Sequence, residues 1–219
     1  MKKTLTVLTL SALLLLTALP AMAGAIYGEF MFFGSWDKEA FNYSLDGEAS
    51  QLTFGLNYPL INDFLLGAEL STGSMEATSI HGRENGFTLI KLKGGYYLIN
   101  NIQTQLAVTG GFSKINLDDL NKKISGWMFG VDLLSALNNQ LNLETALAFS
   151  LKGDYEFTER KKTLNKDCSI LDLKIKLVYY LQSNLAATAS YSYSLSTLDR
   201  PREPKYTLSG VSLGIKYDF

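Results

Sequence analysis

Hydrophobic and polar residues alternate in short stretches along most of the chain after residue 24. The alternation is clearest over residues 210–219. Side chains of a β-strand point alternately to its two faces. One face of this segment is therefore apolar and ends in Tyr217 and Phe219, whereas the other carries Lys216 and Asp218. The pattern predicts a β-strand that lies between an apolar environment and water.

A turn motif recurs between the alternating stretches. Residues 58–64, 96–102 and 179–185 each begin with a tyrosine and have a leucine at the third position, and residues 135–141 hold a weaker copy. Each copy supplies Asn, Asp or Ser where the backbone must reverse, which is typical of hairpin turns. Longer polar stretches lie between these turns, near residues 37–47, 73–86, 114–124, 153–168 and 196–206.

Four short turns and five long loops connect ten strands. We therefore expect an all-β protein, a transmembrane antiparallel up-and-down β-barrel of ten strands, with eight strands as the second choice. An even strand number, short turns on one side and longer loops on the other are the features of bacterial membrane barrels. A soluble barrel or sandwich, with the apolar face packed inside, is the alternative that alternation alone leaves open.

Aromatic residues favour the membrane barrel because they gather at both ends of the expected strands, where such barrels carry girdles. The short-turn side has Tyr58, Tyr96, Tyr179, Tyr217 and Phe219. The long-loop side has Trp36, Phe112, Trp127, Phe149, Tyr191 and Tyr193.

Residues 1–23 read as a cleaved signal peptide. Lys2 and Lys3 precede an apolar run from Leu5 to Leu19, and Ala21 to Ala23 form a small-residue cleavage site. The apolar run is shorter than the roughly 18 to 20 residues of a membrane-spanning helix. Residues 24–219 would then form the barrel, with 18 basic and 21 acidic residues and a formal net charge of −3. The sequence shows no clustered basic face of the kind that would indicate nucleic-acid binding.

The terminal strand resembles the sorting signal of Gram-negative outer-membrane proteins, because it ends on an aromatic residue after Tyr217, namely Phe219. This resemblance implies location in the cell outer membrane. It also implies outer-membrane lipid, lipopolysaccharide and the barrel-assembly machinery as partners.

The polar faces of the strands carry charges that would lie in the barrel lumen. They are Glu29, Glu69, Lys91, Lys93, Asp132, Glu144, Asp172, Lys174, Lys176 and Lys216. Comparison of neighbouring strands predicts that Glu69 lies beside Lys91 or Lys93, Glu144 beside Lys176, and Glu29 beside Lys216. Unpaired buried charges cost several kcal/mol each, so pairing is expected. The network is either a structural plug or an ion pathway. We favour the plug, because ten strands are nearer the filled eight-stranded size than that of open porins.

The ten strands and their turns resemble the omptins, a family of outer-membrane proteases. The likeness covers residues 50–70, residues 92–97 with the strand that follows, residues 179–181 and residues 213–219. It concerns topology more than motif. Omptins carry an Asp pair in the second outer loop and an Asp-x-His set in the fourth. Here the second loop has Glu76, His81 and Glu84, and Asp154-Tyr155-Glu156 in the fourth lacks the histidine.

We therefore expect no catalytic residues, no cofactor and no metal site. A lone loop histidine such as His81 is typical of a solvated surface, and the chain has no His/Cys cluster. The expected function is that of a non-enzymatic membrane barrel with surface loops for structural or interaction roles. A narrow pore for ions or small solutes and an omptin-like protease are the alternatives. Basic loop tips could meet an extracellular ligand; they comprise Arg160, Lys161, Lys162, Lys166, Arg200, Arg202 and Lys205, with Asp118 and Asp119 nearby.

Overall fold

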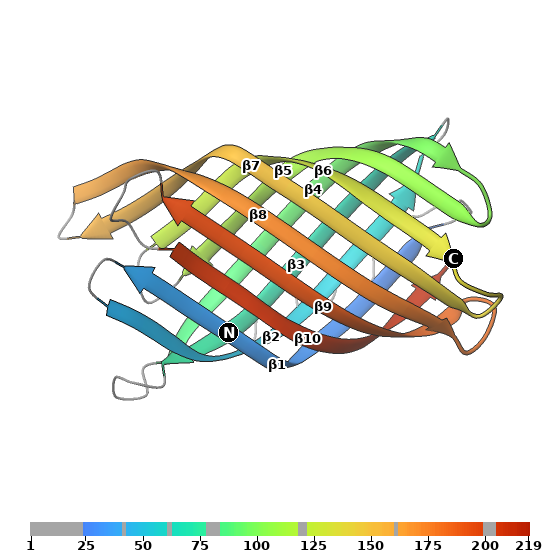
Figure 1. Cartoon of the computed structure of the whole chain (residues 1–219), viewed down its shortest axis with the longest axis horizontal. Helices are drawn as coiled ribbons and strands as arrows, with labels where there is room; N and C mark the ends of the chain where they lie inside the picture. The colour runs from blue at the N-terminus through green and yellow to red at the C-terminus, as the bar shows by residue number, and fades with distance from the viewer. Residues whose placement is uncertain are drawn as a thin grey trace, which may run out of the picture.

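The chain folds into ten antiparallel β-strands that form one closed barrel (Figure 1). The computed structural model describes residues 24–40, 43–60, 63–77, 84–117, 122–159, 162–198 and 205–219. The strands are β1 (Ala25–Ala40), β2 (Tyr43–Pro59), β3 (Phe64–Ala77), β4 (Glu84–Asn100), β5 (Thr104–Leu117), β6 (Lys122–Ala136), β7 (Leu141–Glu159), β8 (Lys162–Tyr180), β9 (Leu185–Leu198) and β10 (Lys205–Asp218). Among the described residues, no helix is long and apolar enough to cross a membrane.

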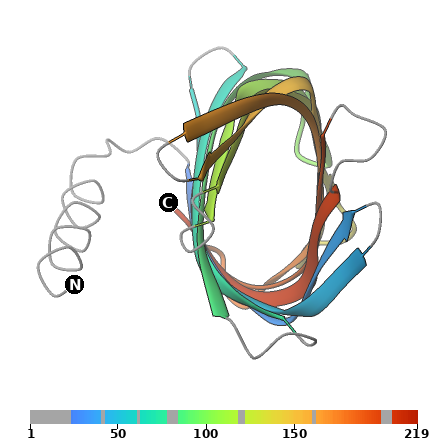
Figure 2. The same cartoon turned by 90° about the vertical axis from the view of Figure 1, so that its left-hand side faces the viewer.

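Each strand pairs with its neighbours in sequence, and β10 pairs with β1 to close the ring (Figure 2). At this seam the backbone N–H of Gly24 donates to the carbonyl of Phe219 at 2.9 Å, and the N–H of Phe219 donates back at 2.8 Å. A closed barrel leaves no strand edge with unpaired backbone groups. The predicted ten-stranded up-and-down barrel is confirmed.

The four recurring turn motifs all lie at one end of the barrel, between β2 and β3, β4 and β5, β6 and β7, and β8 and β9. The side-chain oxygen of Asn101 accepts the backbone N–H groups of Gln103 and Thr104 at 3.0 and 2.8 Å. Asn138 does the same one hairpin later, at 2.8 and 2.9 Å. Asp63 has a φ of 65°, a conformation that Asp adopts more readily than most residues. These hydrogen bonds and the positive φ of Asp63 explain why the chain reverses direction at these turns.

The strands extend farther at the other end than the sequence predicted. Most of the predicted loop at residues 153–168 belongs to β7 and β8, which have 19 residues each and reach the left-hand end of Figure 1. A membrane-spanning strand needs only about 9 to 11 residues. The polar composition of these segments predicts loops, but hairpin pairing continues in water once the register is set.

The outer surface of the barrel is apolar along the middle of the strands. Its exposed side chains include Phe54, Leu66, Leu92, Val108, Trp127, Phe129, Leu147, Ile175, Leu177, Tyr191, Leu213 and Ile215. The charged residues in the middle of the same strands point inward, and Glu29, Lys176 and Lys216 are buried. A soluble barrel would have the opposite arrangement. An apolar outside around a polar inside is the pattern of a transmembrane barrel.

One predicted girdle residue, Trp36, faces the interior instead. The register of β1 shifts between Met31 and Phe33, so Phe32 and Phe33 both face outward. Trp36 is buried, and its Nε1 donates to the backbone carbonyl of Glu76 at 3.2 Å. A β-bulge adds one residue and so reverses the faces of all residues beyond it. The prediction for Trp36 was wrong for this reason.

Candidate functional site

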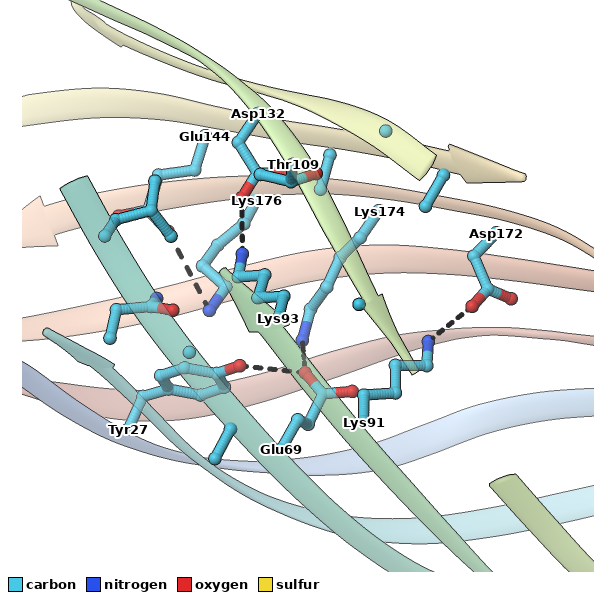
Figure 3. Close-up of a pocket in the computed structure, with 18 of the residues that line it drawn as sticks. Tyr27, Glu69, Lys91, Lys93, Thr109, Asp132, Glu144, Asp172, Lys174 and Lys176 are labelled. Atoms are coloured by element: carbon cyan, nitrogen blue, oxygen red, sulfur yellow. Dashed lines mark hydrogen bonds and ion pairs between the residues drawn. The ribbon is translucent and has the colours of Figure 1, made fainter. Parts of the chain in front are cut away.

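All ten charged residues that the sequence placed in the lumen lie inside the barrel, on seven strands. They are Glu29 on β1, Glu69 on β3, Lys91 and Lys93 on β4, Asp132 on β6, Glu144 on β7, Asp172, Lys174 and Lys176 on β8, and Lys216 on β10. Each takes part in at least one ion pair. Figure 3 shows most of these side chains converging on the centre of the barrel. We call these ten residues, with Asp218, the lumen network.

Glu29 is the most enclosed acid of the lumen network, with a side chain that is 3% exposed. Its carboxylate accepts from the amine of Lys174 at 2.8 Å and from the amine of Lys176 at 2.7 Å. The hydroxyls of Thr188 and Ser190 approach the same carboxylate at 3.5 and 3.3 Å. Four donors around one buried carboxylate satisfy it in the way a buried charge requires.

Glu69 lies on β3, separated by one strand from the β1 strand of Glu29, and shares Lys174 with Glu29. The amine of Lys174 is 3.2 Å from Glu69, and the hydroxyl of Tyr27 donates to Glu69 at 2.8 Å (Figure 3). The amine of Lys176 lies 3.7 Å from the centroid of the Tyr27 ring, a cation–π distance. Tyr27 thus joins two charged groups, a role that the sequence analysis missed. An aromatic residue on the polar face of a strand, two positions before Glu29, was the available signal.

Gly55 makes room for this tyrosine. A Cβ at Gly55 would lie 2.1 Å from the Cζ atom of Tyr27, so the ring rests on the bare backbone of β2. Any larger residue at this position would displace the ring and its hydrogen bond to Glu69.

The remaining ion pairs lie around this centre. Lys91 pairs with Asp172 at 2.8 Å, and Asp172 also accepts from the hydroxyl of Ser194 at 2.6 Å. Lys93 pairs with Asp132. Lys216 pairs with Glu144 at 2.7 Å and with Asp218 at 3.6 Å. The lumen network contains five lysines and six carboxylates, so its charges nearly balance.

Most ion-pair partners differ from those expected by comparing neighbouring strands. Glu69 is opposite Lys91 in the register, but its ion pair is with Lys174. Glu29 is opposite Gly214 rather than Lys216, and it pairs with two lysines of β8. Only the predicted contact of Glu144 with Lys176 occurs between neighbouring strands, at 3.9 Å. Lysine side chains are long enough to cross a narrow lumen, so distance along the sheet does not decide which charges meet.

Several of these pairs connect walls that are far apart around the ring. Glu69 and Lys174 belong to β3 and β8, which are separated by four strands in either direction. Lys91 on β4 and Asp172 on β8 are separated by three. The lumen network therefore spans the barrel from wall to wall.

A cavity of about 570 Å³ lies inside the barrel beside the lumen network. Its wall includes Asn100, Gln105 and Asp218, which lie near the short-turn end. Lys91, Lys93 and Asp132 also line it, and their side chains are more exposed than that of Glu29. The cavity thus reaches the lumen network, in which Glu29 and Lys176 have the most enclosed side chains, at 3% and 5% exposed.

Toward the long-strand end, one side of the interior is lined by apolar side chains. We call them the apolar layer: Ile124, Met128, Tyr155, Cys168, Ile170 and Leu198, which are all buried and in mutual contact. They come from β6, β7, β8 and β9. On this side of the barrel an apolar layer thus lies above the charged one.

The residues behind the other predictions lie as follows. Tyr217 is exposed on the outer surface, where its hydroxyl accepts from Asn184 at 3.0 Å. Phe219 lies at the seam, where its ring covers Gly24. His81, Asp118, Asp119, Arg160, Lys161, Arg200 and Arg202 lie outside the described residues, as do residues 1–23.

Asp154 and Glu156, at the omptin-like spacing, lie on β7 rather than in a loop. Glu156 pairs with Lys123 at 3.7 Å, and Tyr155 between them is buried. In the described part of the chain, no three His, Cys, Asp or Glu side chains are arranged to hold a metal ion.

No family model and no curated protein sequence matches this chain. Solved structures do match it. The outer-membrane protease OmpT from Escherichia coli superposes with a TM-score of 0.64 at 12% identity, over 91% of this chain and 97% of that one. The fold is that of a bacterial outer-membrane barrel. Ail of Yersinia pestis (TM-score 0.43, 13% identity, 90% and 99% covered) and the KdgM porin (0.42, 11%, 90% and 99%) are more distant. At these identities the likeness concerns the fold alone.

Proposed function

We propose that the protein is an integral outer-membrane barrel without enzymatic activity, whose lumen is closed to ion flow and whose long strands present a surface outside the cell. The apolar outer band of the strands supports insertion into lipid. The likeness of the fold to a bacterial outer-membrane barrel supports the choice of membrane.

The observation that carries the closed lumen is the wall-to-wall lumen network beneath the apolar layer. An ion that entered from the short-turn end would have to separate pairs such as Glu29 with Lys174 and Lys176. Removing one partner of a buried pair costs about 3 to 5 kcal/mol. The ion would then meet the apolar layer, whose mainly hydrocarbon side chains replace little of its hydration.

Conductance of the refolded protein in planar bilayers tests this proposal. We expect no reproducible channel steps from the wild-type protein. Glu29→Gln, which weakens the lumen network, should remain closed as long as the apolar layer is intact. Steady channels from the wild type, with ion selectivity that changes in Lys91→Glu, would replace the plug by the pore.

Assembly into the outer membrane gives a second test. We propose that the barrel-assembly machinery recognises the terminal strand, and that lipid and lipopolysaccharide surround the inserted barrel. Deletion of Phe219 should lower the amount of folded protein in outer-membrane fractions, whereas Tyr217→Phe, which keeps the aromatic ring, should insert normally. Equal membrane levels of the Phe219-deleted and wild-type proteins would contradict the role given to the terminal residue.

A further inference from the structure

A group of cationic and aromatic side chains crosses the interior at the outer edge of the apolar layer, with which it shares Tyr155. We call it the mouth cluster: Lys38 on β1, Lys122 on β6, Tyr155 and Phe157 on β7, and Tyr206 on β10. Tyr155 and Tyr206 stack with ring centroids 6.2 Å apart, and their hydroxyls are 3.5 Å apart. Since β7 and β10 are separated by two strands, the mouth cluster bridges the long-strand end of the barrel.

Lys122 is the centre of the mouth cluster. It is 9% exposed, and its amine donates to the hydroxyl of Tyr206 at 3.3 Å. The same amine lies 5.5 Å from the ring centroid of Phe157 and 5.6 Å from that of Tyr206. These are cation–π distances, which offset part of the cost of burying a charge.

Lys122 differs from the lysines of the lumen network because it lacks a carboxylate partner among the described residues. The five lysines of the lumen network each have a carboxylate partner. Within the described ranges, no carboxylate forms an ion pair with Lys122. Buried charges in proteins are normally paired. A buried ammonium surrounded by hydroxyls and aromatic rings is therefore an environment that an anion would complete.

A second cation approaches the same point. The amine of Lys38 lies 5.8 Å from the Tyr206 ring, and Lys38 is opposite Tyr206 in the register of β1 and β10. Lys122 stands five residues beyond Trp127 of the apolar band, outside the membrane-spanning part of β6. Burial, together with the positive charge of Lys38, lowers the pKa of Lys122 to about 8. A bound negative charge would offset both effects, because an opposite charge nearby favours the ammonium form.

We propose that the mouth cluster is a binding site for an oxyanion, such as a phosphate or sulfate group, that enters from outside the cell. The amine of Lys122 would be the main ligand, Lys38 would add a second positive charge, and the hydroxyls of Tyr155 and Tyr206 would donate hydrogen bonds. Charge-assisted hydrogen bonds to oxyanions are among the strongest in proteins. Only the side from which the anion enters rests on the proposed function, because that depends on the orientation of the barrel in the membrane.

Such an oxyanion could be free phosphate or a phosphate group of lipopolysaccharide. The experiment therefore has two arms, both with full-length mature barrel refolded in a non-ionic detergent, since phosphocholine detergents carry a phosphate of their own. In the first arm, inorganic phosphate is titrated and followed by calorimetry and by NMR of ¹⁵N-labelled lysine amines. In the second arm, binding to lipopolysaccharide is compared with binding to the same material after enzymatic dephosphorylation.

We expect saturable binding of one phosphate per barrel, with the largest NMR shift at the Lys122 amine. Lys122→Met should weaken binding by at least about tenfold, since it removes a charge-assisted contact. Lys123→Met is the matched control, because Lys123 is the next residue, points to the other face and pairs with Glu156. It should bind as the wild type does. Tyr206→Phe keeps the ring and removes the hydroxyl, so it should weaken binding by a smaller factor.

Equal affinity of wild type and Lys122→Met in both arms would overturn the proposal, and so would equal losses in Lys122→Met and Lys123→Met. Binding that appears only after Asp118→Asn with Asp119→Asn would also overturn it, because loop carboxylates would then be the counter-charge. Heat-modifiable gel mobility shows whether each variant is folded. If Lys122→Met does not fold, Lys122→Arg and Tyr206→Phe give the comparison. A negative result here leaves the conductance test untouched, so the two proposals fail separately.

Discussion

Replacing Glu29 by glutamine should reveal how strongly the lumen network holds the barrel. The substitution keeps the shape of the side chain but leaves the amines of Lys174 and Lys176 without their shared carboxylate. Lys174 retains Glu69 at 3.2 Å, whereas Lys176, which is 5% exposed, retains only Glu144 at 3.9 Å and the Tyr27 ring. Breaking a buried ion pair costs about 3 to 5 kcal/mol. We expect a loss of about 3 kcal/mol, at the lower end because both lysines keep a partner.

Asp132→Asn is the matched comparison. It also removes one carboxylate from a lysine, but Lys93 and Asp132 are 34% and 24% exposed to the cavity. Solvated pairs contribute only about 0 to 1 kcal/mol. The free energy of unfolding should therefore fall about 2 kcal/mol less in Asp132→Asn than in Glu29→Gln.

The measurement is equilibrium unfolding in lipid vesicles with urea, followed by tryptophan emission and heat-modifiable gel mobility. A double-mutant cycle identifies the partner. Glu29→Gln with Lys176→Met should lose at least about 1 kcal/mol less than the sum of the single changes. Glu29→Gln with Lys93→Gln should be additive within about 0.5 kcal/mol. If Glu29→Gln and Asp132→Asn cost the same, or if the Lys176 cycle is additive, the enclosed centre around Glu29 does not exist in the membrane-embedded protein.

Three further predictions concern the faces of the barrel and its outer end. Leu213→Arg on the apolar face should destabilise the barrel in lipid vesicles by about 2 to 4 kcal/mol, whereas Ser192→Asn on the cavity wall should cost less than about 1 kcal/mol; the reverse order would refute the assigned faces. Gly55→Ala should lower the free energy of unfolding by about 1 to 3 kcal/mol, because the added Cβ would displace the Tyr27 ring. Gly28→Ala is the control and should be nearly neutral in the same unfolding assay, because a Cβ at Gly28 would lie 3.6 Å from its nearest neighbour. The pKa of Lys122 is lowered to about 8 in the folded state, so the unfolded state binds more protons between pH 8 and the usual lysine pKa near 10.5, and the free energy of unfolding should rise with pH in that window. Lys122→Met should remove this rise, and an unchanged rise would assign it to other groups.

Local patterns in the sequence are sufficient to predict the fold and most of the strand faces. Alternation with a period of two is a local property, and so are the Asn and Asp residues that reverse the chain between β2 and β3 or β4 and β5. In an up-and-down barrel each strand pairs with its neighbours in sequence, so local signals suffice to order the sheet. For the same reason the sequence placed Glu29, Lys176 and the other lumen charges on the inward face.

The tertiary structure alone decided which charges meet and where local phase fails. Glu69 and Lys174 face each other only because the sheet closes on itself, and no pattern along one strand encodes a contact between opposite walls. The bulge after Met31 turned Trp36 inward, since one added residue reverses every side chain beyond it. The mouth cluster likewise depends on closure, because Lys122 and Tyr206 come from β6 and β10. Local chemistry fixes the faces of a strand, but the closed ring fixes the partners across it.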